Sequence, residues 1–229
     1  MRVKLQQKHE KKRLHKVKNP DFTIIFANYV TITQIFNKMY NYNHKMLKLI
    51  FGGYAIIITL SILLNILISE CFHLGSEIGN VIYYTNEIIL TGLIIWSAIS
   101  GKRIGINTLG RIGAWIAVPT ILSSLAINCY TLTLYDDYYL NSDIIQALQV
   151  IQFIVSIIIF AALTLWTLGS KLNILAKIAF ITALFAGSIL SWSISFIGLP
   201  YDMYWIWGVI RLIFWLAAAV LILVLPTRE

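Results

Sequence analysis

The sequence predicts an all-α polytopic membrane protein, with six transmembrane helices, an N-terminal interfacial amphipathic helix and both termini in the cytoplasm. Three observations lead to this fold class. Apolar residues make up 59% of the 229 residues and charged residues only 12%, which leaves too little polar surface to coat a soluble core. The apolar residues gather in six long runs. Of the 18 Lys and Arg residues, only Arg211 lies far from the end of such a run.

The first 46 residues divide into two segments. Residues 1–20 are strongly basic and predict a solvated cytoplasmic tail that lies against the anionic lipids of the inner leaflet. In residues 21–46, large apolar side chains recur every three or four positions from Phe22 to Tyr40, as in an amphipathic helix at the membrane surface. A seventh span is the alternative, but the apolar part covers only about 15 residues, whereas a crossing helix needs about 20.

Residues 47–229 are predicted to form the transmembrane domain. A helix of about 20 apolar residues crosses a hydrocarbon core of about 30 Å. Runs of that length occupy residues 48–69, 80–99, 112–134, 144–168, 174–199 and 203–225. We therefore expect six spans.

Charge on the connecting segments predicts their orientation, because cytoplasmic loops near membrane ends retain Lys and Arg. Residues 1–48 hold 11 basic residues. Basic residues return in alternate connections and in the C-terminal tail, at Lys102, Arg103, Arg111, Lys171, Lys177 and Arg228. The positive-inside rule thus places both termini inside. We expect a multi-pass protein of the cell membrane, with an organellar inner membrane as the alternative.

Several function classes lack the residues that they need. The sequence has no Cys/His cluster with metal-ligand spacing, and its four His residues lie outside the predicted spans, so we expect neither a metal nor a cofactor. The net charge of +8 comes from membrane-flanking segments without a base-reading module, which argues against a nucleic-acid partner. No arrangement of nucleophile and base, no paired carboxylates and no phosphate loop is recognisable, so we favour a function other than catalysis.

Two charged residues, Glu87 and Arg211, lie within the predicted membrane core. Charges there usually face the protein interior and find partners, because exposure to lipid is costly. Glu87 follows Gly79 by eight residues and Arg211 follows Asp202 by nine. At about 1.5 Å per residue, both lie roughly 12–14 Å below the outer boundary. The two residues are predicted to form an ion pair or to share one pocket.

Other polar side chains gather in the same outer half of the predicted helices. The candidate ligand-binding set comprises Glu87, Arg211, Tyr83, Tyr84, Asn128, Gln149, Gln152 and Trp207. In one interpretation, Glu87 and Arg211 form a buried salt bridge that fixes helix register. In another, they line a cavity open to the outside, where Arg211 binds an anionic group and Glu87 orients the ligand or binds a cation. Proton transfer through Glu87 is a third interpretation.

Small residues recur at every fourth position of the fifth predicted span. They are Ala179, Ala183, Gly187, Ser191 and Ser195. Such a stripe predicts the close approach of a neighbouring helix.

Two functional hypotheses follow from these patterns. The first is a solute- or lipid-binding transport component that takes its ligand from the outer face. The predicted architecture resembles that of the substrate-capture subunits of energy-coupling transporters, and the surface helix before the first span resembles that of six-helix export permeases. Both resemblances are architectural and rest on no shared motif.

The second hypothesis is a non-transporting accessory, sensor-like or self-protection (immunity-type) protein that acts through protein contacts. For the transport hypothesis, a protein partner could lie in the membrane or dock on the connection 101–110, which could instead be only a positively charged topology loop. Intramembrane catalysis by Glu87 with Tyr83 or Tyr84 is a further alternative.

Overall fold

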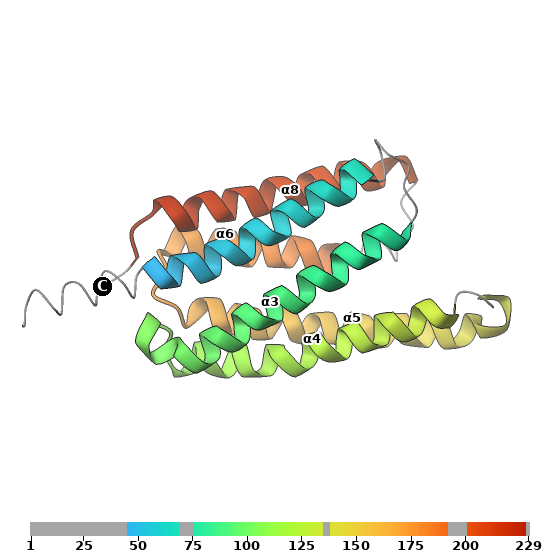
Figure 1. Cartoon of the computed structure of the whole chain (residues 1–229), viewed down its shortest axis with the longest axis horizontal. Coiled ribbons are helices and arrows are strands. Elements are labelled where there is room, and N and C mark those ends of the chain that lie inside the picture. The colour runs from blue at the N-terminus through green and yellow to red at the C-terminus, as the bar shows by residue number, and fades with distance from the viewer. Residues whose placement is uncertain (1–44, 69–75, 135–137, 192–200, 228–229) are drawn as a thin grey trace, which may run out of the picture. The chain divides into compact units, whose positions relative to one another are not determined.

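The computed structural model describes residues 45–68, 76–134, 138–191 and 201–227 (Figure 1). Within these ranges, residues 76–78, 138–140 and 201–204 are described by their backbone alone. All of these residues belong to one compact unit, His44–Glu229. The predicted basic tail and almost all of the predicted interfacial helix lie outside the described residues, as does Ser195.

The described residues are almost entirely helical. The first helix, Lys45–Ile66, is drawn in blue in Figure 1. The others are α3 (Ser76–Ile104), α4 (Thr108–Leu134), α5 (Tyr138–Leu168), α6 (Ile174–Phe185), the π-helix η3 (Ala186–Leu190) and α8 (Tyr201–Val224). Five of the six predicted spans correspond to helices long and apolar enough to cross a membrane, and the run at 174–199 corresponds to a shorter apolar helix, Ile174–Leu190.

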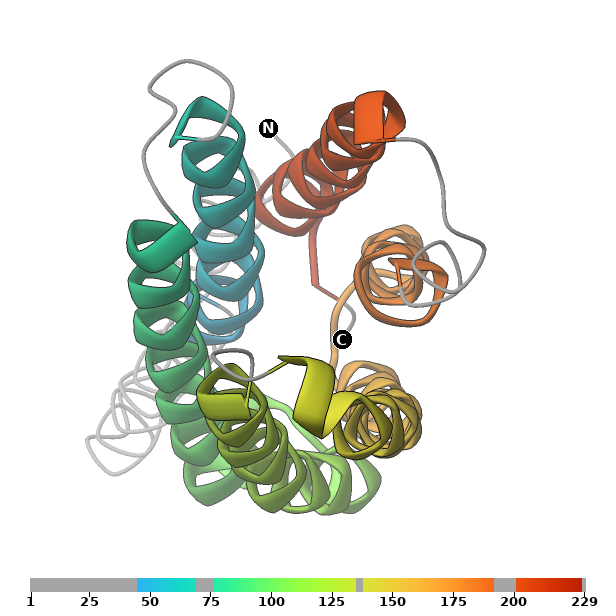
Figure 2. The same ribbon diagram turned by 90° about the vertical axis from the view of Figure 1, so that its right-hand side faces the viewer.

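Consecutive helices lie side by side and form a ring (Figure 2). Extensive packing joins α4 to α5, and α6 packs against α8. The ring closes where α8 meets the first helix. There the Lys48 Nζ donates a hydrogen bond of 2.9 Å to the Leu223 carbonyl oxygen. A Cβ added to Gly52 would lie 3.0 Å from Leu223 Cδ2, so these two helices are in close contact.

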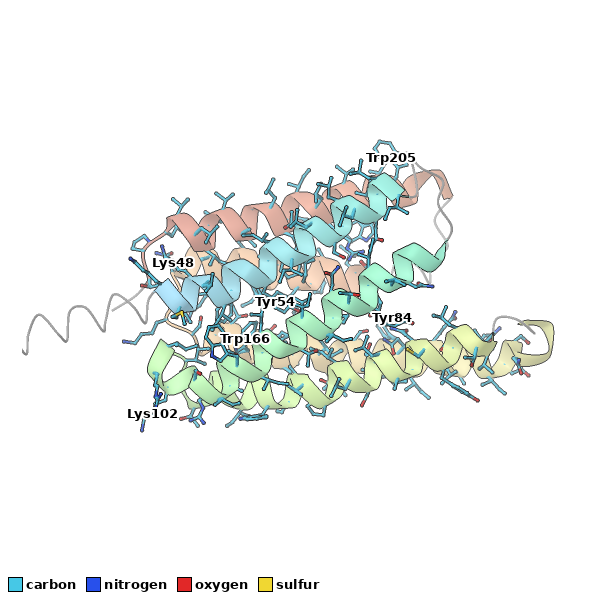
Figure 3. All side chains as sticks on the ribbon, in the orientation of Figure 1. Lys48, Tyr54, Tyr84, Lys102, Trp166 and Trp205 are labelled. Atoms are coloured by element: carbon cyan, nitrogen blue, oxygen red, sulfur yellow. The ribbon has the colours of Figure 1, made fainter. Side chains whose placement is uncertain are left out.

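Basic residues gather at one end of this ring, which we call the basic end. Lys45, Lys102, Arg103 and Lys171 are exposed there, at the start of the first helix, the end of α3 and the connection before α6. Figure 3 shows Lys48 and Lys102 at this end and Trp205 at the opposite end.

The two connections at the basic end are short and bonded to each other. The Asn107 N–H donates to the Gly169 carbonyl oxygen at 2.8 Å, and the Lys171 N–H donates to the Gly105 carbonyl oxygen at 3.0 Å. Gly105 has φ of +87°, a conformation that residues with a Cβ rarely adopt. The predicted docking segment 101–110 is therefore mostly helix, with residues 105–107 as a tight link.

An aromatic cluster fills the half of the ring toward the basic end. It comprises Phe51, Tyr54, Trp166, Phe180 and Trp215, all at most 5% exposed. Phe51 and Trp166 stack with ring centroids 4.1 Å apart, and Phe180 meets Trp215 edge-on at 5.4 Å. Aromatic pairs in these geometries add to the stability gained from burial. The cluster joins the first helix, α5, α6 and α8.

The outward faces of the helices are strongly apolar. Val224, Val81, Ile88 and Ile99 expose 64–72% of their surface, and many other Leu and Ile side chains are exposed. Soluble proteins rarely present contiguous apolar surface on this scale. The chain is therefore a helical, multi-pass membrane protein, whose exposed apolar side chains face lipid.

The small residues of the fifth predicted span lie along α6 and η3. Ala183 is fully buried. A Cβ added to Gly187 would lie 3.3 Å from the Trp215 Nε1 of α8. Ser191 accepts a hydrogen bond of 3.0 Å from the Trp207 indole N–H. This face of α6 and η3 lies against α8.

A substitution at Gly113 tests whether α4 packs closely on α5. A Cβ at Gly113 would lie 2.5 Å from the Ala162 carbonyl oxygen and 2.6 Å from the Trp166 amide nitrogen, and backbone atoms of this kind cannot rotate away. We expect Gly113→Ala to destabilise the bundle by about 1–3 kcal/mol, as overpacked cores do. The measurement is the thermal unfolding midpoint of the purified protein in detergent.

Gly92→Ala is the matched control, since a Cβ at Gly92 would meet nothing within 4 Å. It should leave the midpoint unchanged or raise it slightly, because Ala favours helix over Gly. Equal midpoints for both variants would contradict the close approach of α4 and α5.

Candidate functional site

A cavity of about 640 Å³ lies at the centre of the ring, and every described helix contributes to its wall. It extends from Ile68, Gly79 and Trp205, near the end opposite the basic end, down to Tyr54 and Trp215 of the aromatic cluster. The polar residues of the wall are Tyr54, Ser61, Asn65, Tyr83, Asn86, Glu87, Ser124, Asn128, Gln152, Ser156, Ser188 and Arg211. Ligand cavities of soluble and membrane proteins have volumes in this range.

Glu87 of α3 and Arg211 of α8 line this cavity and are both half-buried. Among the described residues no ion pair, taken as a nitrogen and an oxygen within 4.0 Å, joins them. The Arg211 Nε is buried without a hydrogen-bond partner. Charges withdrawn from bulk water need compensating partners, so both side chains depend on what fills the cavity.

The first helix and α3 are joined by a polar contact at the cavity wall. The Asn86 Nδ2 donates a hydrogen bond of 2.7 Å to the Ser61 Oγ. Asn65, one turn further along the first helix, also lines the cavity. Ser61 and Asn65 belong to the first helix, which lies between α3 and α8 in the ring (Figure 2).

Gln152 of α5 carries the polar contact on the other side of the cavity. Its Nε2 donates a hydrogen bond to the Ser124 Oγ of α4. Its backbone carbonyl accepts a bond of 2.8 Å from the Ser156 Oγ. The Gln152 Oε1 is buried and has no hydrogen-bond partner, although the residue is only 5% exposed. An unsatisfied buried acceptor is destabilising unless a ligand or water donates to it.

A second, smaller pocket of about 210 Å³ lies between α3, α4 and α5. We call it the side pocket. Tyr83, Asn128 and Gln152 line both this pocket and the central cavity. The Asn128 Nδ2 donates a hydrogen bond of 3.3 Å to the Tyr83 hydroxyl. This bond and the Gln152 side chain form a common wall between the two spaces.

The floor of the central cavity is the aromatic cluster. Tyr54 and Trp215 belong to both, with ring centroids 5.9 Å apart. The Trp215 Nε1 is buried and lacks a hydrogen-bond partner. The floor thus offers aromatic surface and one unused donor.

The structure brings five of the eight predicted ligand-binding residues together in the central cavity. They are Glu87, Arg211, Tyr83, Asn128 and Gln152. Tyr84 and Gln149 line only the side pocket. Trp207 lines neither space and donates its indole N–H to Ser191 instead.

Sequence reasoning missed the contribution of the first helix. Tyr54, Ser61 and Asn65 line the cavity, yet none stood out as a candidate. Their separations of seven and four residues place them on one helical face, which is the signal that could have identified them. Trp215 and Ser188 also line the cavity and lie outside the predicted set.

The groups in the wall are suited to binding a polar molecule. Among the described residues, no group of three or more His, Cys, Asp or Glu side chains is placed to hold a metal ion. The cavity presents one carboxylate, one guanidinium, amides and hydroxyls, all of which form hydrogen bonds with a ligand.

A double-mutant cycle at Glu87 and Arg211 tests whether they stabilise each other. Breaking a buried ion pair typically costs about 3–5 kcal/mol, whereas separate groups act additively. Because no ion pair within 4.0 Å joins the two side chains among the described residues, we expect Glu87→Gln and Arg211→Gln to remain folded and their coupling energy to stay below about 1 kcal/mol. The measurement is folded yield and unfolding midpoint of both single variants and the double variant. Collapse of the singles with recovery in the double would reveal a structural ion pair.

Comparison with known proteins finds no relative of this chain. No family model matches the sequence, and searches against curated proteins and solved structures give no significant match.

Proposed function

We propose that this chain is the solute-binding component of a membrane transport system, which captures a small polar molecule in the central cavity. The observation that carries the proposal is the cavity of about 640 Å³, lined by an unpaired carboxylate and an unpaired guanidinium from different helices. Small-molecule sites typically combine apolar walls with a few convergent polar groups. A lipid chain would leave the two charges without partners, so a solute fits this lining better.

The proposal includes an orientation in the cell membrane. Six spans, with Ile174–Leu190 belonging to the fifth, would place both termini in the cytoplasm. The basic end would face the cytoplasm, because Lys and Arg are retained there. The basic tail, residues 1–20, would then lie on anionic lipids, and residues 21–46 would lie in the interface. The mouth near Trp205 would face the outside, and the connection at the basic end would be available to a protein partner.

The closed floor supports capture from the outer face. The aromatic cluster packs the half of the ring toward the basic end, whereas the polar wall lies in the other half. A solute entering at the mouth would reach Glu87 and Arg211 and stop at Tyr54 and Trp215. Release toward the cytoplasm would require these rings to separate.

Thiol labelling tests whether the cavity is accessible from outside. In a protein with Cys71 and Cys129 replaced by Ala, we expect Ser188→Cys to react with a membrane-impermeant maleimide applied to right-side-out vesicles, because Ser188 lines the cavity. Ser97→Cys is the matched control, since Ser97 is 0% exposed and lines neither space. It should stay unlabelled until the protein is denatured.

Lys102→Cys completes the labelling experiment, because Lys102 is exposed at the basic end. It should react only in inverted vesicles. Failure of Ser188→Cys to react in right-side-out vesicles, while Lys102→Cys reacts in inverted ones, would refute an outward-facing cavity.

Reporter fusions test the orientation independently. We expect a fluorescent protein fused after residue 229 to be fluorescent, because it would remain in the cytoplasm. Alkaline phosphatase inserted at residues 136–137 should be active, because that connection would lie outside. The reverse pattern would invert the proposed topology and turn the cavity mouth toward the cytoplasm.

A further inference from the structure

Three buried hydrogen-bonding atoms of cavity-lining residues lack a partner, and the two donors lie on a different helix from the acceptor. The donors lie on α8, where the Arg211 Nε and the Trp215 Nε1 are both buried without a partner. These residues are four positions apart and therefore share one helical face. The acceptors lie across the ring, where α3 provides the Glu87 carboxylate and α5 the partnerless Gln152 Oε1. In the ring, α8 lies between the first helix and α6. Neither α3 nor α5 is therefore next to α8 (Figure 2).

We propose that the solute bound in this cavity is an amphipathic zwitterion, of amino-acid to short-peptide size, with its carboxylate on Arg211 and its ammonium on Glu87. This inference rests on the proposed function, since it names the class of solute for the same cavity. The ammonium also donates to the Gln152 Oε1, and the Trp215 indole N–H provides a further donor on the carboxylate side.

Charge balance selects a zwitterion over a singly charged solute. The side chains that line the cavity carry one negative and one positive charge, at Glu87 and Arg211. An anion would satisfy Arg211 and leave Glu87 withdrawn from water without a partner, and a cation would do the reverse. Leaving a buried charge unpaired is strongly unfavourable. A molecule with both charges compensates both side chains at once.

The guanidinium and the carboxylate differ in what they recognise. A guanidinium presents a planar fork of N–H donors that matches the two oxygens of a carboxylate. The three N–H donors of an ammonium suit scattered acceptors, such as a carboxylate oxygen and an amide oxygen. The two sides of the cavity therefore define the direction in which the solute lies.

The rest of the cavity wall is apolar and is suited to contact an apolar part of the solute. Tyr54 and Trp215 form the aromatic floor, and aliphatic side chains such as Ile62, Leu90 and Ile121 complete the wall. A volume of about 640 Å³ exceeds that of one free amino acid, so a short peptide also fits.

Matched probes test the inference on the full chain in lipid nanodiscs by calorimetry. The zwitterions are L-phenylalanine, glycyl-L-phenylalanine and glycylglycyl-L-phenylalanine, in which the charges lie progressively farther apart. Each is compared with its C-terminal amide, which lacks the anion, and with its N-acetyl form, which lacks the cation. We expect at least one zwitterion to bind and both of its single-charge forms to bind about 10-fold more weakly or worse, since hydrogen bonds to charged groups are strong.

Variants assign each charge to its side chain. In Glu87→Gln the zwitterion should lose its advantage over the N-acetyl form, and in Arg211→Gln it should lose its advantage over the amide. Gln149→Ala is the control, because Gln149 lines only the side pocket, and it should keep both preferences. If either charge variant fails to fold, the inference is tested by the wild-type protein alone, through its affinities for each zwitterion and its two single-charge forms.

The outcomes separate this inference from the function on which it rests. If a single-charge form binds as well as its zwitterion, the solute is not recognised by both charges, and the inference is overturned while a solute site stands. If no probe binds, the inference is also overturned. In that case, labelling of Ser188→Cys from outside would still support the outward-facing solute site. Absence of labelling would contradict both the solute site and the zwitterion.

Discussion

The aromatic cluster around Trp166 is the contact on which the rest of the bundle depends. In lipid, apolar burial gives helices little reason to associate, so van der Waals packing must hold them together. Trp166, Phe51 and Phe180 are fully buried and join three helices through stacked and edge-on rings. Tyr54 and Trp215 extend the same contact to α8. Because one half of the ring is packed in this way, the helices can stand apart in the other half without the bundle separating.

The helices of the ring contact one another in two different ways. Where α4 meets α5 and the residue that follows it, Gly110, Gly113 and Gly169 allow the backbones to approach closely. Where α3 and the first helix meet at the cavity, the short polar side chains of Asn86 and Ser61 form a hydrogen bond instead. Glu87 and Arg211 project into the space that remains. They form no ion pair among the described residues, although opposite charges attract.

Much of the fold could be predicted from the sequence because lipid imposes a simple length requirement. Five apolar runs became long helices, although α5 begins at Tyr138, six residues before its predicted start, because polar residues such as Asn141 and Asp143 are tolerated at a helix end. Glu87 and Arg211 could be singled out because charges in such runs are rare. Ser61 and Asn65 stand out less, because single small polar residues are common in membrane helices, and only their shared helical face with Tyr54 points to them. Trp207 illustrates the converse, since its position suggested a ligand and its indole bonds Ser191.

The order of the ring has a consequence for how the protein is made. Neighbours in the ring are consecutive in the chain, so each new helix can dock on the one before it during synthesis. The seam between the first helix and α8 is the exception, since its partners, Lys48 and Leu223, are 175 residues apart. Until α8 emerges from the ribosome, the nascent bundle is an open arc in which Glu87 faces an unsealed side. Arrival of α8 brings Arg211 and closes the wall, so assembly of the cavity and completion of its charge set are a single event.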